Sequence, residues 1–175
     1  MRTSDTDAQA LDALTLATRT AVAILGPGDH AREVAQDVAV RVLERRSQLR
    51  DPDKFAAWVH RIALREALRA QHGTRKRTAV ERRLDGAALD VPAPAPDPTA
   101  RLDAAEAARL ALARLGDRER AAMVLRDVHD LPDSQIAAIL GCRRGTVNSL
   151  ISRARTRLRA MPDLQLLASD PGATR

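Results

Sequence analysis

Aromatic residues are nearly missing from this sequence of 175 residues: Phe and Trp occur once each, and Tyr is absent. Strands usually draw on aromatic and β-branched residues, so the shortage argues against a β-rich fold. It also leaves few rings that could stack on single-stranded bases. Ala, Leu and Arg dominate instead, and they favour helices. We therefore expect an all-α protein.

Cysteine is almost as scarce. Cys142 is the one cysteine, so an intrachain disulfide is excluded. Cys and His are nowhere grouped at metal-ligand spacing, and no nucleophile, base and orienting group can be assembled from the sequence pattern. We therefore expect no metal, no other cofactor, no catalytic residues and no enzymatic activity.

Long uncharged apolar runs are also lacking, and none approaches the length that crosses a membrane. The first residues, MRTSDTDAQALDAL, carry acids where a signal peptide needs a basic start and an apolar core. These features predict a soluble cytoplasmic protein with no membrane partner. What the chain does have is positive charge, with a net charge of +6 and a pI near 11.0, which makes a polyanionic partner plausible.

Hydrophobic periodicity predicts five helices before residue 130. Gly26-Pro27-Gly28 separates the first two, Asp29 and Asp117 are candidate helix caps, and Gly73 is expected to end the third. Phe55 and Trp58 fall on the buried face of the third helix, whereas His60 lies one residue past that face and is expected to be exposed. The expected helices cover residues 7–25, 29–46, 53–71, 100–115 and 117–128.

The most informative stretch is residues 131–158, LPDSQIAAILGCRRGTVNSLISRARTRL. Pro132 suits the first turn of a helix that Gly141 ends, and a second helix follows almost at once. In the second helix an apolar stripe at positions 147, 151, 154 and 158 leaves a basic, amide- and hydroxyl-bearing face free. A short helix, a tight turn and a basic helix form the helix-turn-helix that reads the DNA major groove. The alternative is an ordinary all-α domain whose basic face is exposed to solvent and does not bind DNA.

A proline-rich segment, DGAALDVPAPAPDPT, divides the chain. Prolines at alternate positions exclude a helix there, so we expect an extended acidic linker between two small helical domains. The predicted organisation is a first domain at 1–84, a linker at 85–100, a second domain at 101–161 and a short disordered tail at 162–175.

With the two domains in this order, the chain resembles the bacterial RNA polymerase sigma factors of the small, extracytoplasmic-function type. In the second domain, LGDRERAAMVLR resembles the family pattern LPxRxRxVLxLR, and IAAILG followed by GTVNS and RARTRL resembles IAxxLGxSxGTVKSRLxRARxxL. In the first, EVAQDV resembles DLVQEVF, and FAAWVHRIA resembles FRAWLYRIA. The resemblance covers most of the chain except its start, linker and tail.

The resemblance implies a promoter-specificity subunit. Residues 1–84 would be region 2, which docks on the clamp helices of the polymerase β′ subunit and melts the minus-ten element. Residues 101–161 would be region 4, which binds the β flap and reads the minus-thirty-five element. The linker would cross the RNA path of the polymerase.

Residue roles follow by position. The clamp-binding helix would contribute Gln36, Asp37, Val40 and Arg41. Contacts in the minus-ten region would come from Ser47, Gln48, Arg50, Asp51, Lys54, Arg61, Arg65 and Arg69. The recognition helix would use Arg143, Arg144, Thr146, Asn148, Ser149, Ser152 and Arg153. The implied partners are core polymerase, promoter DNA and an anti-sigma protein, and the free chain would be a monomer.

Some positions depart from the family pattern. Arg65 and Arg69 stand where Asn and Asp are common, Asn148 replaces a frequent Lys, and Leu150 replaces a frequent Arg. At Leu150 we expect a hydrophobic contact with a thymine methyl group or a protein. Two alternatives stay open: a helix-turn-helix regulator with an unrelated helical sensor at residues 1–84, and a helical adaptor that binds no DNA. The basic segment at 69–83 argues against a sensor.

Overall fold

The structure is a computed structural model that describes residues 2–84 and 104–161, and within these residues it contains helices and no strand. The all-α prediction is therefore confirmed. The expected linker and tail lie outside the described residues, so their predicted form is untested. No helix in the described part is long and apolar enough to cross a membrane.

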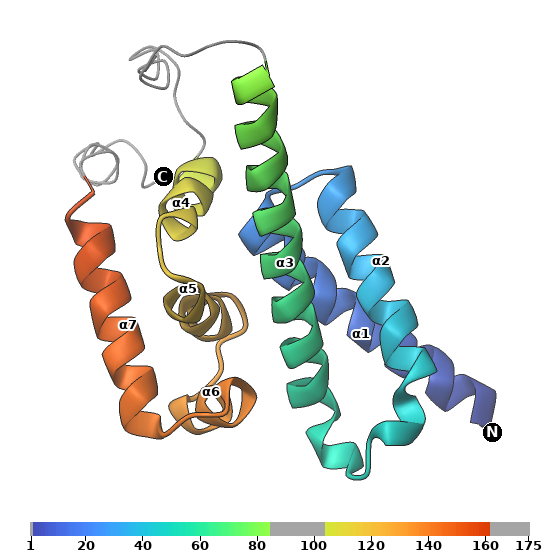
Figure 1. Cartoon of the computed structure of the whole chain (residues 1–175). Helices are drawn as coiled ribbons and strands as arrows, with labels where there is room; N and C mark the ends of the chain where they lie inside the picture. The colour runs from blue at the N-terminus through green and yellow to red at the C-terminus, as the bar shows by residue number, and fades with distance from the viewer. Residues whose placement is uncertain (1, 85–103, 162–175) are drawn as a thin grey trace, which may run out of the picture.

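The helices form two groups that pack side by side (Figure 1). The N-terminal bundle consists of α1 (Arg2–Leu25), α2 (Asp29–Glu44) and α3 (Phe55–Leu84), with two short 3₁₀ turns, η1 (Arg46–Gln48) and η2 (Pro52–Lys54), between α2 and α3. The C-terminal bundle consists of α4 (Ala104–Ala113), α5 (Asp117–Met123), the π turn η3 (Val124–Val128), α6 (Asp133–Leu140) and α7 (Arg144–Arg159).

Two hydrophobic clusters hold these helices together. The first joins α1, α2 and α3 through small and β-branched residues such as Ala17, Ala35, Val38 and Val59, with Phe55 and Trp58 packed half-buried against it. The core position predicted for the two aromatic residues is thus confirmed. The second cluster fills the C-terminal bundle but also takes in Ile24, Leu64 and Ala67 of the N-terminal bundle.

The helix starts differ from the prediction by one residue. Gly28 and Gly116 occupy the N-cap positions, and the expected caps Asp29 and Asp117 are the first helical residues instead. Their carboxylates then act in the first turn, where negative charge is favourable near the positive end of the helix dipole. Pro132 is likewise an N-cap and not a first-turn residue.

The prediction that Gly73 ends the third helix is wrong, because α3 continues for eleven more residues to Leu84. A glycine inside a helix costs only ~1 kcal/mol relative to alanine, and the residues that follow, TRKRTAVERRL, include strong helix formers and no proline. The longer α3 carries the basic segment away from the bundle as a single rod (Figure 1).

The helix-turn-helix prediction is confirmed in its geometry. Gly141 ends α6 with φ 62 and ψ 44, the left-handed conformation that glycine adopts without steric cost. Arg143 is the extended N-cap of α7. The stripe Val147, Ile151 and Ala154 is buried, so α7 packs on α5 and α6 through the face that the sequence pattern predicts.

Candidate nucleic-acid interface

The free face of α7 is the most direct candidate for contact with DNA. The side chains on this face are polar or basic and exposed, and no residue of α7 is acidic. The Ser149 hydroxyl donates to the Gly145 carbonyl 2.9 Å away, so it can still accept a hydrogen bond from outside. The predicted recognition residues all lie exposed at this end of the molecule: Arg143, Arg144, Thr146, Asn148, Ser149, Ser152 and Arg153.

One buried carboxylate organises the basic side of this helix. Glu119 of α5, whose side chain is 8% exposed, lies 2.7 Å from an Arg157 nitrogen and 3.4 Å from Arg153 Nε. A buried carboxylate needs such partners, because burying an unpaired charge is costly. Arg153 was predicted to contact DNA, and the structure anchors its Nε on α5 instead of leaving the whole side chain free.

A polar hollow lies along the other flank of α7. It is lined by Arg126, Asp133, Asn148, Ser152, Arg155 and Arg159. Arg126 and Asp133 form a close ion pair there, which ties η3 to the first residue of α6. Arg155 lies 3.9 Å from Asp127. Asn148 and Ser152 therefore lie beside two ion pairs, Arg126 with Asp133 and Arg155 with Asp127.

The expectation that Leu150 meets a thymine methyl group or another protein is wrong. Its side chain is 4% exposed and belongs to the hydrophobic cluster of the C-terminal bundle. Position 150 follows Val147 by three residues, so both fall on the buried face of α7. Leu150, which stands where the family often has an arginine, therefore belongs to the hydrophobic core and not to the binding face.

The residues predicted for the minus-ten region form a loop and a stripe. Ser47, Gln48 and Arg50 are exposed in the loop between α2 and α3, at one end of the N-terminal bundle. Asp51 caps η2 by accepting from the Asp53 N–H at 3.1 Å and pairs with Lys54 at 2.9 Å. The hydrogen bond from Lys54 lowers the pKa of Asp51 below its usual value, so the pair stays charged.

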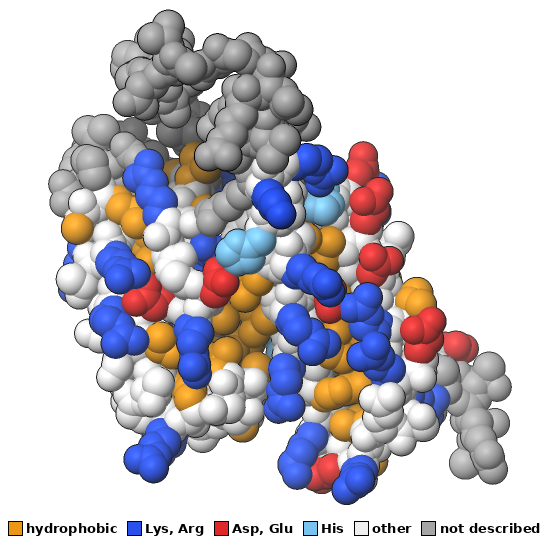
Figure 2. All heavy atoms as spheres, viewed as in Figure 1, with side chains coloured by type: hydrophobic (Ala, Val, Ile, Leu, Met, Phe, Trp, Pro, Cys, Tyr) orange, Lys and Arg blue, Asp and Glu red, His pale blue; other side chains and the backbone are white. Residues whose placement is uncertain are grey.

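Arg61, Arg65 and Arg69 follow each other at four-residue spacing along α3 and are exposed. Residues four apart lie on one face of a helix, so the three cations form a single stripe. Arg61 also donates to the carbonyl of Ala138 in α6 at 3.4 Å. Figure 2 shows Lys and Arg side chains on both sides of an apolar cleft between the two bundles.

The residues predicted for polymerase binding lie on α2. Gln36 and Asp37 are exposed, and Val40 is 54% exposed although it is apolar. Arg41 is only half-exposed and pairs with Glu66 of α3 at 2.5 Å. The structure therefore presents three of the four residues outward and uses Arg41 to join α2 to α3.

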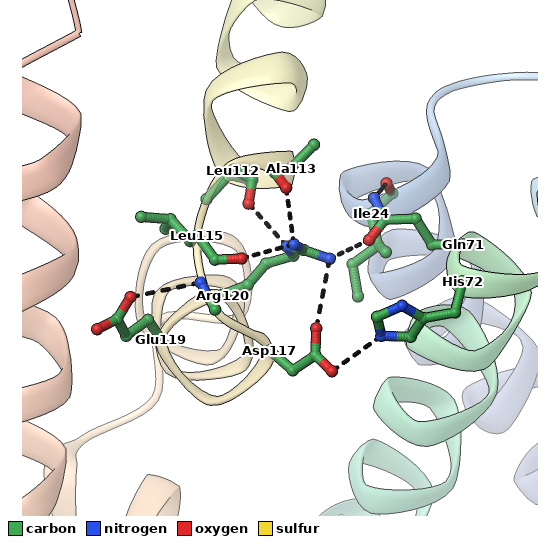
Figure 3. Close-up of polar contacts among 10 residues, drawn as sticks. Ile24, Gln71, His72, Leu112, Ala113, Leu115, Asp117, Glu119 and Arg120 are labelled. Atoms are coloured by element: carbon green, nitrogen blue, oxygen red, sulfur yellow. Dashed lines mark hydrogen bonds and ion pairs between the residues drawn. The ribbon is translucent and has the colours of Figure 1, made fainter. Parts of the chain in front are cut away.

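Sequence reasoning missed Arg120, which is the largest fully buried side chain among the described residues. Its guanidinium donates to the carbonyls of Leu112 at 2.7 Å, Ala113 at 2.9 Å and Leu115 at 2.7 Å, and also to Gln71 Oε1 of α3 (Figure 3). Carbonyls at the end of a helix have no partner within that helix, and Arg120 supplies one for the end of α4. Nothing in the local pattern shows this, because an arginine in RERAAM reads as a surface residue.

The expectation that His60 is exposed is also wrong, since it is 3% exposed. Its ring packs edge-on against His129 of η3, with centroids 4.3 Å apart. The Thr20 hydroxyl donates to the Leu16 carbonyl, so His129 Nε2 donates to Thr20 Oγ1 across 2.8 Å. Burial, His60 and Arg19 lower the pKa of His129 to about 4, and burial lowers that of His60 in the same direction.

In residues 2–84 and 104–161, no three His, Cys, Asp or Glu side chains are grouped so that they could hold a metal ion. The geometry offers two basic faces instead. One is α7 in the C-terminal bundle, and the other is the loop and α3 stripe of the N-terminal bundle.

Comparison with known families gives two matches. The family model described as Sigma-70 region 2 matches residues 12–77, and the model described as Sigma-70, region 4 matches residues 105–158. The two matches fall on the N-terminal and C-terminal bundles in that order. The sensor interpretation of residues 1–84 loses its basis, because this part of the chain matches the region 2 model.

Individual proteins agree. The chain is 30% identical over 141 residues to the ECF RNA polymerase sigma factor EcfG of Rhodopseudomonas palustris, covering 81% of this chain and 76% of that protein. It is 35% identical over 149 residues to SigE of Mycolicibacterium smegmatis, covering 81% of this chain and 55% of that protein. It also spans 41% of SigG of Mycobacterium tuberculosis, at 29% identity over 75% of this chain.

Two solved structures share the fold. The sigma factor RpoE of Bartonella quintana, in complex with the anti-sigma factor NepR, aligns with a TM-score of 0.64 at 26% identity, covering 95% of this chain and 98% of that one. CnrH, in complex with the cytosolic domain of CnrY, aligns with a TM-score of 0.58 at 26% identity, covering 93% and 85%.

Proposed function

This chain belongs to the extracytoplasmic-function sigma factors of the sigma-70 family, which are non-enzymatic subunits of transcription initiation, and we infer that it directs bacterial RNA polymerase to its promoters. The N-terminal bundle would bind the β′ clamp and open the minus-ten element. The C-terminal bundle would bind the β flap and read the minus-thirty-five element. The observation that carries this proposal is the presence of two separate basic faces, one on each sigma region.

In the C-terminal bundle, Arg144 and Asn148 are the residues that we propose read bases. Arg can make a bidentate contact to guanine and Asn to adenine in the major groove. Arg143, Thr146, Ser149 and Ser152 flank them on the exposed face and suit phosphate contacts. Arg153 is held by Glu119, which supports a phosphate contact from its remaining donors at a fixed position. Each good base contact adds about 1–3 kcal/mol of discrimination.

In the N-terminal bundle, we propose that the loop at residues 47–54 receives the unpaired base. Holding a base outside the stack costs a few kcal/mol, so it needs both a pocket and nearby cations. The stripe formed by Arg61, Arg65 and Arg69 supplies cations along α3 where the displaced strand would run. The Asp51–Lys54 pair gives the loop a fixed turn, which would reduce the entropy lost when it binds.

Binding to core polymerase is assigned to the exposed part of α2, namely Gln36, Asp37 and Val40. The core of a protein interface is more apolar than the rest of the surface, so the exposed apolar side chain of Val40 suits such a contact. We also propose that an anti-sigma protein regulates the chain, because the similar RpoE is bound to the anti-sigma factor NepR and the similar CnrH is bound to the cytosolic domain of CnrY.

A binding measurement tests the polymerase assignment. Val40→Glu places a charge in the proposed contact, and because Val40 is 54% exposed the fold should tolerate it. We expect at least a tenfold loss of affinity for purified core polymerase, which corresponds to ~1.4 kcal/mol. Leu11→Glu is the matched control, since Leu11 is 64% exposed on α1. Equal affinity of the Val40→Glu protein and the wild type would contradict the assignment.

A further inference from the structure

Two arginines one turn apart on α7 share a single carboxylate. Glu119 of α5 places its Oε2 2.7 Å from Arg157 Nη1 and its Oε1 3.4 Å from Arg153 Nε. The Glu119 side chain is 8% exposed, whereas those of Arg153 and Arg157 are 59% and 56% exposed. The carboxylate therefore lies beneath two guanidinium groups that remain open to solvent.

Glu119 is itself held in place within α5. Its Oε2 also accepts from the Gly116 N–H at 3.4 Å, which is the reach-back half of a capping box at the start of the helix (Figure 3). This hydrogen bond restricts the rotamer of the glutamate. Because α5 packs directly on α7, the carboxylate is a fixed point against which side chains of α7 can be positioned.

The two arginines extend the face that we propose meets DNA. Ser149, Arg153 and Arg157 follow one another at four-residue spacing, so they form one stripe along a flank of α7. A helix about 10–12 Å in diameter fills a major groove about 12 Å wide, so its flanks lie next to the phosphate backbones. The cations of this stripe would therefore meet phosphates of one strand. Arg157 was not among the residues predicted to contact DNA.

The shared carboxylate makes this pair of cations ready to bind. Two like charges four residues apart on a helix repel each other, and a free arginine side chain loses rotamer freedom when it binds. Glu119 reduces both costs, because it lies close to both guanidinium groups and holds them in one geometry. An arginine has five N–H donors, so each side chain keeps donors for a phosphate.

The opposite flank of α7 shows the contrast. Arg155 lies 3.9 Å from Asp127, and both of these side chains are about half exposed. An exposed pair at this distance is weak and fixes neither side chain. Preorganised cations are thus a property of the flank that carries Arg153 and Arg157.

We propose that Arg157 is a further DNA contact and that Glu119 positions it together with Arg153, so that the two guanidinium groups bind phosphates of one strand of the upstream element. Glu119 is a positioning residue, because it acts only through the two arginines. This inference rests on the proposed function, since it requires the C-terminal bundle to bind promoter DNA. The alternative is that Glu119 only joins α5 to α7.

Glu119→Gln separates the two roles by the sign of its effect. The substitution raises the formal net charge of +6 by one, which alone favours binding to DNA. A positioning role predicts the opposite, a loss of about tenfold in affinity, which is typical of one hydrogen bond to a charged group. Asp130→Asn is the matched control, because it adds the same charge at an exposed residue whose φ of 52 asparagine also adopts.

Affinity is measured for the full chain on core polymerase, over a range of salt concentrations. The probe is the DNA duplex that the wild-type holoenzyme selects from a random-sequence library. Each phosphate contact contributes ~0.9 to the slope of log affinity against log salt, so Glu119→Gln should reduce the slope by about one to two. Asp130→Asn should keep the slope and bind at least as tightly as the wild type. Undiminished affinity or an unchanged slope for Glu119→Gln would overturn the proposal.

A second set of variants leaves the buried carboxylate intact. Arg157→Met should fold, because Arg157 is 56% exposed, and should weaken binding about tenfold. Arg32→Met removes the same charge from the exposed surface of α2 and should change the affinity by less than about twofold. Equal affinities of these two variants would show that Arg157 is not a contact.

The final comparison combines the substitutions. In a chain that already carries Arg153→Met and Arg157→Met, Glu119→Gln should cause no further loss of affinity, because the residues through which it acts are gone. The same loss in both backgrounds would assign Glu119 a structural role only. If the wild-type holoenzyme binds duplexes no better than core polymerase does, the proposed function fails and this inference with it. If the wild type binds and the variants match it, only the inference fails.

Discussion

Removing the guanidinium of Arg120 should destabilise this protein far more than removing that of the exposed Arg118 in the same helix, α5. Arg120 is 1% exposed, and Arg120→Met keeps most of its apolar volume while deleting the donors. The carbonyls of Leu112, Ala113 and Leu115 and Gln71 Oε1 would each lose the hydrogen bond from Arg120, and the Leu112 carbonyl would keep only the one from the Leu115 N–H. The substitution therefore separates the hydrogen bonds from the packing of the side chain.

The magnitude follows from two opposing effects. A hydrogen bond from a charged donor contributes about 1.5–3 kcal/mol, so four of them would exceed 6 kcal/mol if they were additive. The methionine variant also avoids burying a charge, which offsets part of the loss. We expect a net decrease of about 3–5 kcal/mol in the free energy of unfolding, a large part of the ~5–15 kcal/mol typical of a folded domain.

Urea denaturation followed by circular dichroism measures this change. The midpoint should fall while the slope stays constant, because the surface exposed on unfolding is nearly the same. Arg118→Met is the control, since Arg118 is exposed two residues away, and it should change the free energy by less than ~0.5 kcal/mol. Arg120→Lys should fall between them, because lysine lacks the planar fork of donors. A loss below ~1 kcal/mol for Arg120→Met would refute the assigned role.

Two further predictions concern pH and DNA. The pKa of His129 is lowered to about 4 in the folded protein, so the stability that the buried neutral ring contributes is fully present above its usual pKa of 6.5 and is lost by ~1.4 kcal/mol per pH unit as the pH falls toward 4. The urea midpoint should fall over this range, less so in His129→Gln, and an identical fall in both would contradict the role of His129. Arg144→Ala should weaken binding to a minus-thirty-five duplex and reduce the slope of log affinity against log salt by about one. An unchanged slope would show that Arg144 meets no phosphate.

Local signals were sufficient to predict the helix-turn-helix. Gly141 ends α6 because a left-handed residue is needed there, and the stripe from Val147 to Ala154 packs inward because residues at this spacing share a face. The loop residues Ser47, Gln48 and Arg50 lie exposed at one end of the N-terminal bundle, beside the proposed strand path. These features depend on neighbours within one or two helical turns, which a sequence pattern records.

The errors occur where distant parts of the chain meet. His60 is buried because His129, 69 positions later, packs on it, and Arg120 is buried because Gln71 and the end of α4 accept its hydrogen bonds. Burial of these two side chains depends on how the two bundles pack, and periodicity within one helix cannot show it. Leu150 is a different error, since its three-residue spacing from Val147 already places it on the buried face of α7. The end of α3 was missed for another reason: one glycine is too weak a signal to stop a helix.

The most direct measurement of the central claim is transcription in vitro from a library of promoter sequences, with core polymerase alone and with this protein added. The proposed function predicts transcripts that start at defined positions only when the protein is present, downstream of shared minus-thirty-five and minus-ten sequences. Arg144→Ala should lose mainly the preference at the upstream element. Identical transcripts with and without the protein would contradict the proposal that it is the promoter-specificity subunit.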